Sequence, residues 1–192
     1  MINEPNRSCC IRLWSDNREL FEKAQGSIVK HQAWRGGYLQ HLEECGNIAI
    51  QQYDWMSQTK RELPFSLSDA LLVLCVHDLE KPFKQAGLIV GAVDASGMKN
   101  REVLERFKLE KLNEYNIVLT RHQSIALQHI EGELDYSLTE KLMNPLGAFC
   151  HSCDVLSARM WYDRPLREKE NWSKEIKTVR KSNLFVRAPT FI

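Results

Sequence analysis

Apolar residues recur three and four positions apart along much of the chain, and sustained alternation of apolar and polar residues is nearly absent. The first spacing is typical of one face of an α-helix, and the second would be typical of a strand. The pattern therefore predicts an all-α protein, in which the run GLIVGAV fits either a short strand or a buried turn. The predicted helices cover residues 18–30, 38–57, 67–78, 99–112, 117–130 and 138–159, and the last range holds one helix or two.

The predicted helix at residues 67–78 is apolar on nearly all sides and opens with a capping box at Ser66. A helix without a polar face belongs in the interior of a protein. Its last residues are His77 and Asp78. Pro82 lacks an N–H and restricts the residue before it, so we expect it to end the helix shortly after Asp78. Inside a straight helix, adjacent side chains point about 100° apart and could not easily reach one point. At a helix end, the side chains of His77 and Asp78 could do so.

The length of 192 residues favours one domain with a substantial core. We place this domain at residues 1–162 and a polar, basic-rich extension at residues 163–192. The extension is expected to pack on the domain or on a neighbouring subunit, in a homo-oligomer.

The net charge of +1 gives no bulk electrostatic argument for nucleic acid or for an anionic membrane. No apolar run approaches the roughly 18–20 residues that a membrane span needs, and the N-terminus lacks the basic and apolar segments of a signal peptide. We therefore expect no membrane partner and no nucleic-acid partner. The expected location is the cytoplasm, or the host cytoplasm if the protein is encoded by a phage.

The chain contains six cysteines, and Cys150 and Cys153 have the C-x-x-C spacing of zinc and redox sites. A second pair at a suitable spacing is absent, and other cysteines lie within helical apolar patterns. Free, mostly buried thiols in a reducing compartment are therefore the preferred interpretation.

Imidazole and carboxylate groups, which suit divalent metals, occur at His41, at the adjacent pair His77 and Asp78, and at Asp154. A carboxylate at the end of a buried helix is costly to desolvate and meets the unfavourable end of the helix dipole. A bound cation would offset both penalties at Asp78, although an Arg or Lys partner could do the same. Taken singly, His41 and Asp154 are explained by ordinary hydrogen bonding or surface exposure as readily as by metal binding.

Three segments, GGYLQHLEE, CVHDLEKP and HSCDVLSAR, together resemble the H…HD…D signature of the HD-domain metal-dependent phosphohydrolase superfamily. The resemblance spans residues 36–159. It implies a compact helical HD-domain fold in a single domain. It also implies that one divalent metal ion (Zn, Mn, Co, Fe or Mg) is held by His41, His77, Asp78 and Asp154.

Two residues beside the HD pair are candidates for catalysis. Lys81 matches the lysine of the family's HD-x-x-K segment, which implies contact with a substrate phosphate; the alternative is a solvated surface lysine. Glu80 can act as a general base or orient a water molecule, or it can simply be exposed.

The stretch KHQAWRGGY is a second candidate region for substrate contacts. Arg35 offers a bidentate fork for phosphate or is solvated, and Trp34 can stack on a base or pack in the core. Gly37 allows close approach of the backbone to a ligand. Lys30 and His31 are weaker candidates.

Three later residues complete the candidate set. Arg159 can reach a phosphate or pair with a carboxylate. His122 and His129 lie seven residues apart, so on one helix they share a face. Some HD proteins bind further metals through histidines in this interval, but the surrounding residues do not match that pattern cleanly, which favours a substrate-binding, acid/base or surface role.

The resemblance implies hydrolysis of a phosphate ester or anhydride by a metal-activated water, with a nucleotide as the substrate. Small phage-type members remove triphosphate from deoxynucleoside triphosphates such as dATP. Members that act on deoxynucleoside 5′-monophosphates usually carry Glu at the position of Lys81, so the lysine favours the triphosphohydrolase. The open alternatives are the monophosphatase, an HD-type nuclease or phosphodiesterase, and a non-catalytic nucleotide-binding module.

Overall fold

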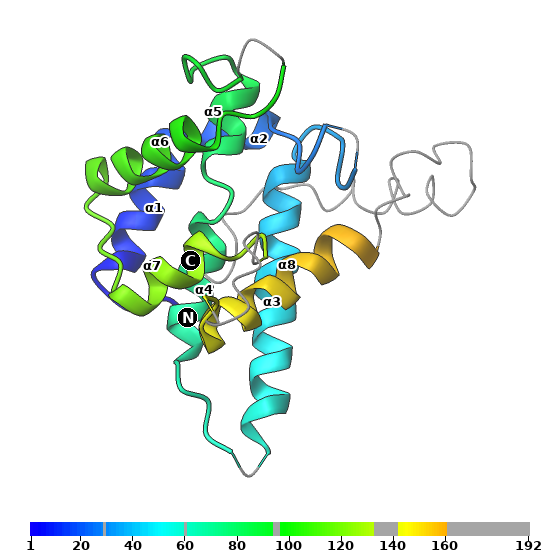
Figure 1. Ribbon diagram of the computed structural model, residues 1–192, viewed down its shortest axis with the longest axis vertical. Coiled ribbons are helices and arrows are strands. Elements are labelled where there is room, and N and C mark those ends of the chain that lie inside the picture. The colour runs from blue at the N-terminus through cyan, green and yellow to red at the C-terminus, as the bar shows by residue number, and fades with distance from the viewer. Residues whose placement is uncertain (29, 60, 94–96, 133–141, 161–192) are drawn as a thin grey trace.

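The computed structural model describes residues 1–28, 30–59, 61–93, 97–132 and 142–160. Within these ranges the chain forms helices, turns and one isolated β-bridge between Val93 and Lys99, which confirms the predicted all-α class. The helices are α1 (Asn6–Asp16), α2 (Arg18–Lys23), α3 (Gly37–Ser57), α4 (Leu67–Val76), α5 (Glu80–Gln85), α6 (Arg101–Glu114), α7 (Arg121–Gln128) and α8 (Pro145–Met160). Figure 1 shows how they are arranged.

Helix α4 is the centre of the fold, as its apolar sequence predicts. The Ser66 hydroxyl accepts a hydrogen bond from the backbone N–H of Asp69, and the Asp69 carboxylate accepts one from the backbone N–H of Ser66. Every residue from Ala70 to Val76 is buried. The helix packs against α3, α7 and α8, and α8 crosses the long helix α3 (Figure 1).

The expected role of Pro82 was wrong. Helix α4 ends at Val76, and residues 77–79 form a turn that leads into α5. Pro82 lies in the first turn of α5, where helical N–H groups have no partner inside the helix, so its missing N–H costs little. The break after α4 therefore precedes the proline and is not caused by it.

The helices near the N-terminus also differ from prediction. Helix α1 was not predicted, because only Cys10 and Leu13 of its residues are buried and it has little apolar periodicity. The predicted helix at residues 18–30 ends early, at Lys23, and an irregular loop leads from there to α3. This loop matters because it lies against the candidate site.

The predicted helix at residues 38–57 corresponds closely to α3, and α6 and α7 fall near their predicted ranges. Pro145 begins α8, so it is a first-turn residue rather than a break. The GLIVGAV run forms turns, with Ile89 and Ala92 buried. Residues 133–141 and the predicted extension at 163–192 lie outside the described residues.

All six cysteines are free thiols, five of them buried, which confirms that part of the prediction. In the described part of the chain, no helix combines the length and the apolar character needed to cross a membrane.

Candidate metal centre

The predicted ligands come together from three helices. His41 lies on α3, His77 and Asp78 follow the last residue of α4, and Asp154 lies on α8. The two histidine Nε2 atoms are 3.3 Å apart. Asp154 Oδ1 is 3.1 Å from His41 Nε2 and 3.7 Å from His77 Nε2. Asp78 Oδ2 is 3.5 Å and 3.2 Å from the same two nitrogens. These atoms therefore form one compact cluster of imidazole and carboxylate donors.

The position of the cluster follows from the packing of α3, α4 and α8 against one another. Because α4 is buried on all sides, its end is fixed in the interior, and the turn after Val76 lets the adjacent His77 and Asp78 reach the same point. His41, His77 and Asp78 are buried, and the Asp154 side chain is 19% exposed. The cluster thus meets solvent on the side of Asp154.

The Asp78 carboxylate is a buried group whose charge needs compensation. Its Oδ2 atom is in direct ionic contact with the Lys81 ammonium and lies 3.2 Å from His77 Nε2. Burial acts to raise the pKa of Asp78, but the charges of His77 and Lys81 hold it well below its usual range. An ionised, buried carboxylate needs positive charge beside it, and a cation could supply that charge.

The pKa shifts of the histidines and of Asp154 indicate how protons balance the charge of the cluster. Burial lowers the pKa of His77, but the carboxylates of Asp78 and Asp154 outweigh burial and raise it to about 10. Burial lowers the pKa of His41. The pKa of Asp154 is also lowered: burial opposes this, and the contacts of its carboxylate with His41 and His77 outweigh it. A proton on His77 and the ammonium of Lys81 therefore balance the negative charge of the two carboxylates.

The ring of His77 is oriented by a backbone contact of Nδ1. Its Nδ1 lies 2.8 Å from the backbone carbonyl oxygen of Leu74, one turn earlier on α4. A carbonyl oxygen can only accept a hydrogen bond, so Nδ1 carries a proton and donates it. In the neutral ring, Nε2 then has the lone pair, and this is the atom that faces His41 and the two carboxylates.

Lys81 and Glu80 lie beside the cluster. The Lys81 side chain is 15% exposed and is ion-paired with Asp78, which excludes a freely solvated lysine. Glu80 is buried, which excludes the alternative that it is simply exposed. Its carboxylate lies 3.2 Å from Nζ of Lys108 on α6, and the same ammonium contacts the backbone carbonyl of His77. Lys108 was missed by the sequence analysis because it looks like any other charged residue on α6.

The stretch KHQAWRGGY forms the end of the loop before α3. Trp34 is half-buried and donates a hydrogen bond from Nε1 to Gln40 Oε1, and Arg35 is exposed. A Cβ atom at Gly37 would lie 1.8 Å from the backbone oxygen of Gln32. The close approach expected at Gly37 is therefore an approach to this loop, and its contact with a substrate stays a prediction.

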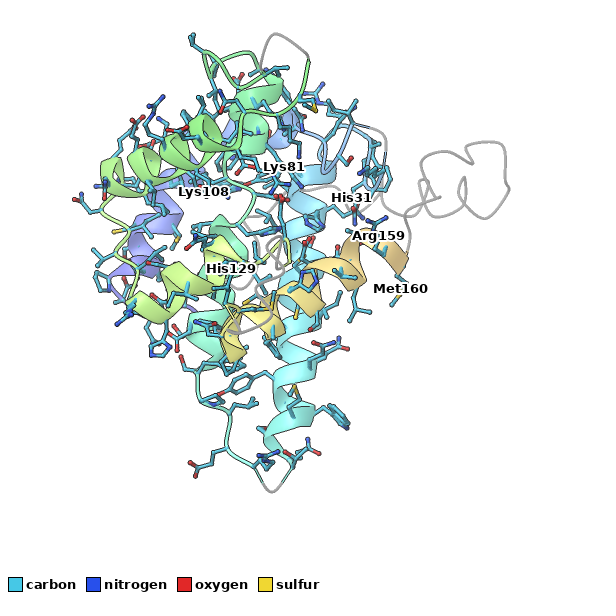
Figure 2. The ribbon with its side chains drawn as sticks, viewed as in Figure 1. His31, Lys81, Lys108, His129, Arg159 and Met160 are labelled. Carbon is cyan, nitrogen blue, oxygen red and sulfur yellow. The ribbon has the colours of Figure 1, made fainter. Side chains whose placement is uncertain are left out.

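The remaining candidates lie at different distances from the cluster. His31 is the nearest: its ring centroid is 4.8 Å from that of His41. Burial, followed by the charges of His41 and Lys81, lowers the pKa of His31 to about 4. His31, Lys81 and the exposed Arg159 lie on the same side of the molecule, and His129 lies at the end of α7 (Figure 2). His122 is exposed and, within the described residues, makes no polar contact with the four ligands.

Comparison with protein-family models, with curated proteins and with solved structures finds no match to this chain. The HD-domain hypothesis therefore rests on the three sequence motifs and on the geometry of the residues that they contain.

Proposed function

We propose that this protein is a metal-dependent nucleotide phosphohydrolase of the HD-domain type. One observation carries the proposal. The four residues that the motifs single out as ligands, separated by up to 113 positions in the sequence, place their donor atoms within a few ångströms of one another. A chance resemblance of three short motifs would give no reason for these side chains to meet.

The donor set fits a divalent cation. His41, His77 and Asp154 each offer an atom within 4.8 Å of the others, and Asp78 adds a second carboxylate to the same cluster. Two imidazoles and two carboxylates are ligands that zinc, manganese, iron, cobalt and magnesium accept to different degrees. Such an ion, when bound, would polarise a phosphoryl group and lower the pKa of a water molecule.

The charges around the cluster favour an anionic substrate. A divalent cation would balance the carboxylates of Asp78 and Asp154, and the proton on His77 would no longer be needed. Lys81, whose side chain is itself partly exposed, would then leave an unbalanced positive charge beside the centre. A phosphate group entering from solvent would meet this charge and could replace Asp78 as its partner.

Among phosphate compounds, the proposal favours a deoxynucleoside triphosphate, with intact triphosphate as the released product. Lys81 stands where monophosphatases of this type usually carry Glu, and a cation at this position suits a longer and more negative phosphate chain. His31, which lies next to His41 on the same side as Lys81, adds a neutral polar group for a further contact.

The proposal is tested by a phosphate-release screen of the full chain in manganese, cobalt and magnesium. The substrates are dNTPs, NTPs, nucleoside monophosphates, cyclic dinucleotides and short oligonucleotides, and product analysis separates triphosphate from orthophosphate. Turnover of a dNTP that Asp78→Asn abolishes and Asp16→Asn preserves is the expected result, since Asp16 is exposed on α1. Cation binding without turnover of any phosphate compound would instead indicate a binding module.

A further inference from the structure

A chain of hydrogen bonds runs behind the candidate centre, from the loop before α3 to His41. His31 Nδ1 lies 2.6 Å from Gln32 Oε1, and Gln32 Nε2 lies 2.7 Å from Glu44 Oε2. The same Glu44 oxygen lies 3.1 Å from Ser157 Oγ, which lies 3.0 Å from His41 Nδ1. Ser157 is on α8, one turn after Asp154, and the two residues contact different nitrogens of the His41 ring: Asp154 lies at Nε2 and Ser157 at Nδ1.

The direction of each hydrogen bond follows from the carboxylate in the middle. An ionised carboxylate can only accept, so both the Gln32 amide and the Ser157 hydroxyl must donate to Glu44. Ser157 has one hydroxyl hydrogen, and this bond uses it. Its Oγ can therefore only accept from His41, which requires the proton of His41 to be on Nδ1.

The hydrogen bond from His41 Nδ1 to Ser157 competes with Asp154, which favours a proton on Nε2 of the same ring. Asp154 Oδ1 lies 3.1 Å from His41 Nε2 and would draw a proton to that nitrogen. Cys45 Sγ lies 3.8 Å from each ring nitrogen and is a weaker partner for either of them. Ser157, with Glu44 behind it, is thus the group at Nδ1 that favours the form of His41 with its proton there. A proton on His77 Nε2, 3.3 Å from His41 Nε2, favours the same form.

Two residues of this hydrogen-bonded series, Gln32 and Ser157, are in positions that are unfavourable for polar side chains. Gln32 is a polar residue with only 2% of its surface exposed. Its backbone lies in the left-handed region, with φ of 38°, which is unfavourable for a residue other than glycine. Ser157 is 1% exposed and Glu44 is partly buried. The hydrogen bonds that these polar groups make with one another offset the free-energy cost of burying them.

We propose that Ser157 is a positioning residue, held by Glu44 and Gln32, that keeps the proton of His41 on Nδ1 and so leaves the Nε2 lone pair directed at the centre. The role of that lone pair as a metal ligand rests on the proposed function; the position of the proton does not. Groups that fix the tautomer of a ligand histidine in this way typically change metal affinity by about 10–100-fold when they are removed.

The position of the proton is measured directly by long-range ¹H–¹⁵N correlation spectra of the metal-free full chain labelled at histidine, at pH 8, with His41→Asn to assign the resonance. We expect neutral His41 with its proton on Nδ1. In Ser157→Ala the proton should move to Nε2, toward Asp154, and Mn²⁺ affinity measured by calorimetry should fall by about 10–100-fold. Ser152→Ala, which removes a hydroxyl from the same helix, should leave both unchanged. Glu44→Gln should keep the proton on Nδ1, because an amide oxygen can accept both bonds.

A wild-type His41 with its proton on Nε2, or on both nitrogens, would overturn the inference, and so would Ser157→Ala with an unchanged tautomer. The wild-type spectrum decides the matter even if Ser157→Ala fails to fold. If the wild-type proton is on Nδ1 but no cation binds, the assignment of the tautomer holds and the proposed function fails.

Discussion

His41 Nε2 and His77 Nε2 face each other at 3.3 Å in the interior of the protein, one on α3 and the other at the end of α4. Two neutral imidazoles with lone pairs on both of these atoms would repel each other, so a proton on one of them, or a cation between them, is favourable. A proton on His77, whose pKa the carboxylates of Asp78 and Asp154 raise to about 10, meets this need in the metal-free protein. A divalent cation would take the place of that proton.

Cation binding should therefore depend on pH in a defined direction. Because His77 stays protonated below about pH 10, an ion that binds its Nε2 must release that proton. Apparent affinity for Mn²⁺ should then rise by about tenfold for each pH unit between pH 6.5 and 8.5, with about one proton released for each ion. Calorimetry in buffers of different ionisation enthalpy measures both quantities, and an affinity independent of pH without proton release would contradict the arrangement.

Lys81→Met should separate substrate binding from metal binding. Loss of the ammonium beside Asp78 removes a charge that repels a bound cation, so Mn²⁺ affinity should stay the same or rise. The value of kcat/KM for the phosphate substrate should fall by roughly tenfold or more, because a charge-assisted contact is lost. Lys23→Met is the matched control, since Lys23 forms an exposed pair with Glu19. Weaker metal binding with unchanged kcat/KM would argue against the phosphate contact.

Lys108→Met should destabilise the protein. Its ammonium lies between the buried Glu80 carboxylate and the backbone carbonyl of His77, and both would lose their partner. Removing one member of a buried ion pair costs roughly 3 kcal/mol of unfolding free energy. Urea denaturation measures this loss. The double variant Glu80→Gln with Lys108→Met should recover part of it, and a double variant less stable than Lys108→Met would show that the pair is not coupled in this way.

Two adjacent glycines should respond differently to alanine. Gly36 has a φ of 81° with its nearest neighbour 3.6 Å from an added Cβ, so Gly36→Ala should cost about 1–2 kcal/mol from backbone strain. At Gly37 the added Cβ would meet the Gln32 backbone oxygen at 1.8 Å, so the loop must move and the cost should exceed about 3 kcal/mol. Thermal and urea unfolding compare the two, and equal losses would contradict the close contact.

The helices that could be predicted are those with strong local signals. The apolar run and capping box of α4 fix both its start and its burial, and α3 has a clear apolar face. Helix α1 has no such signal, since most of its residues are exposed. The position of Pro82 shows a related limit: a proline is compatible with the end of one helix and with the first turn of the next, and only the turn at residues 77–79 decides between them.

The candidate site could be predicted only as far as its ligands. His41, His77, Asp78 and Asp154 stand in recognisable motifs, and the structure brings them together. Lys108 lies outside these motifs, and Glu44 and Ser157 lie inside two of them but are not among the ligand positions of the signature. Each is an ordinary polar residue on a helix surface in the sequence, and its role depends on which helix packs against it. Contacts between distant elements are the part that one sequence does not reveal.

The central claim is that these four residues hold one divalent cation, and calorimetric titration of the metal-free full chain tests it most directly. Titration with Mn²⁺ and Zn²⁺ at pH 8 should show one site for each chain. Asp78→Asn should weaken binding by at least tenfold, because a buried charged ligand is lost, and Asp16→Asn should not change it. No binding by the wild-type protein at millimolar metal, or equal affinity in Asp78→Asn, would contradict the account.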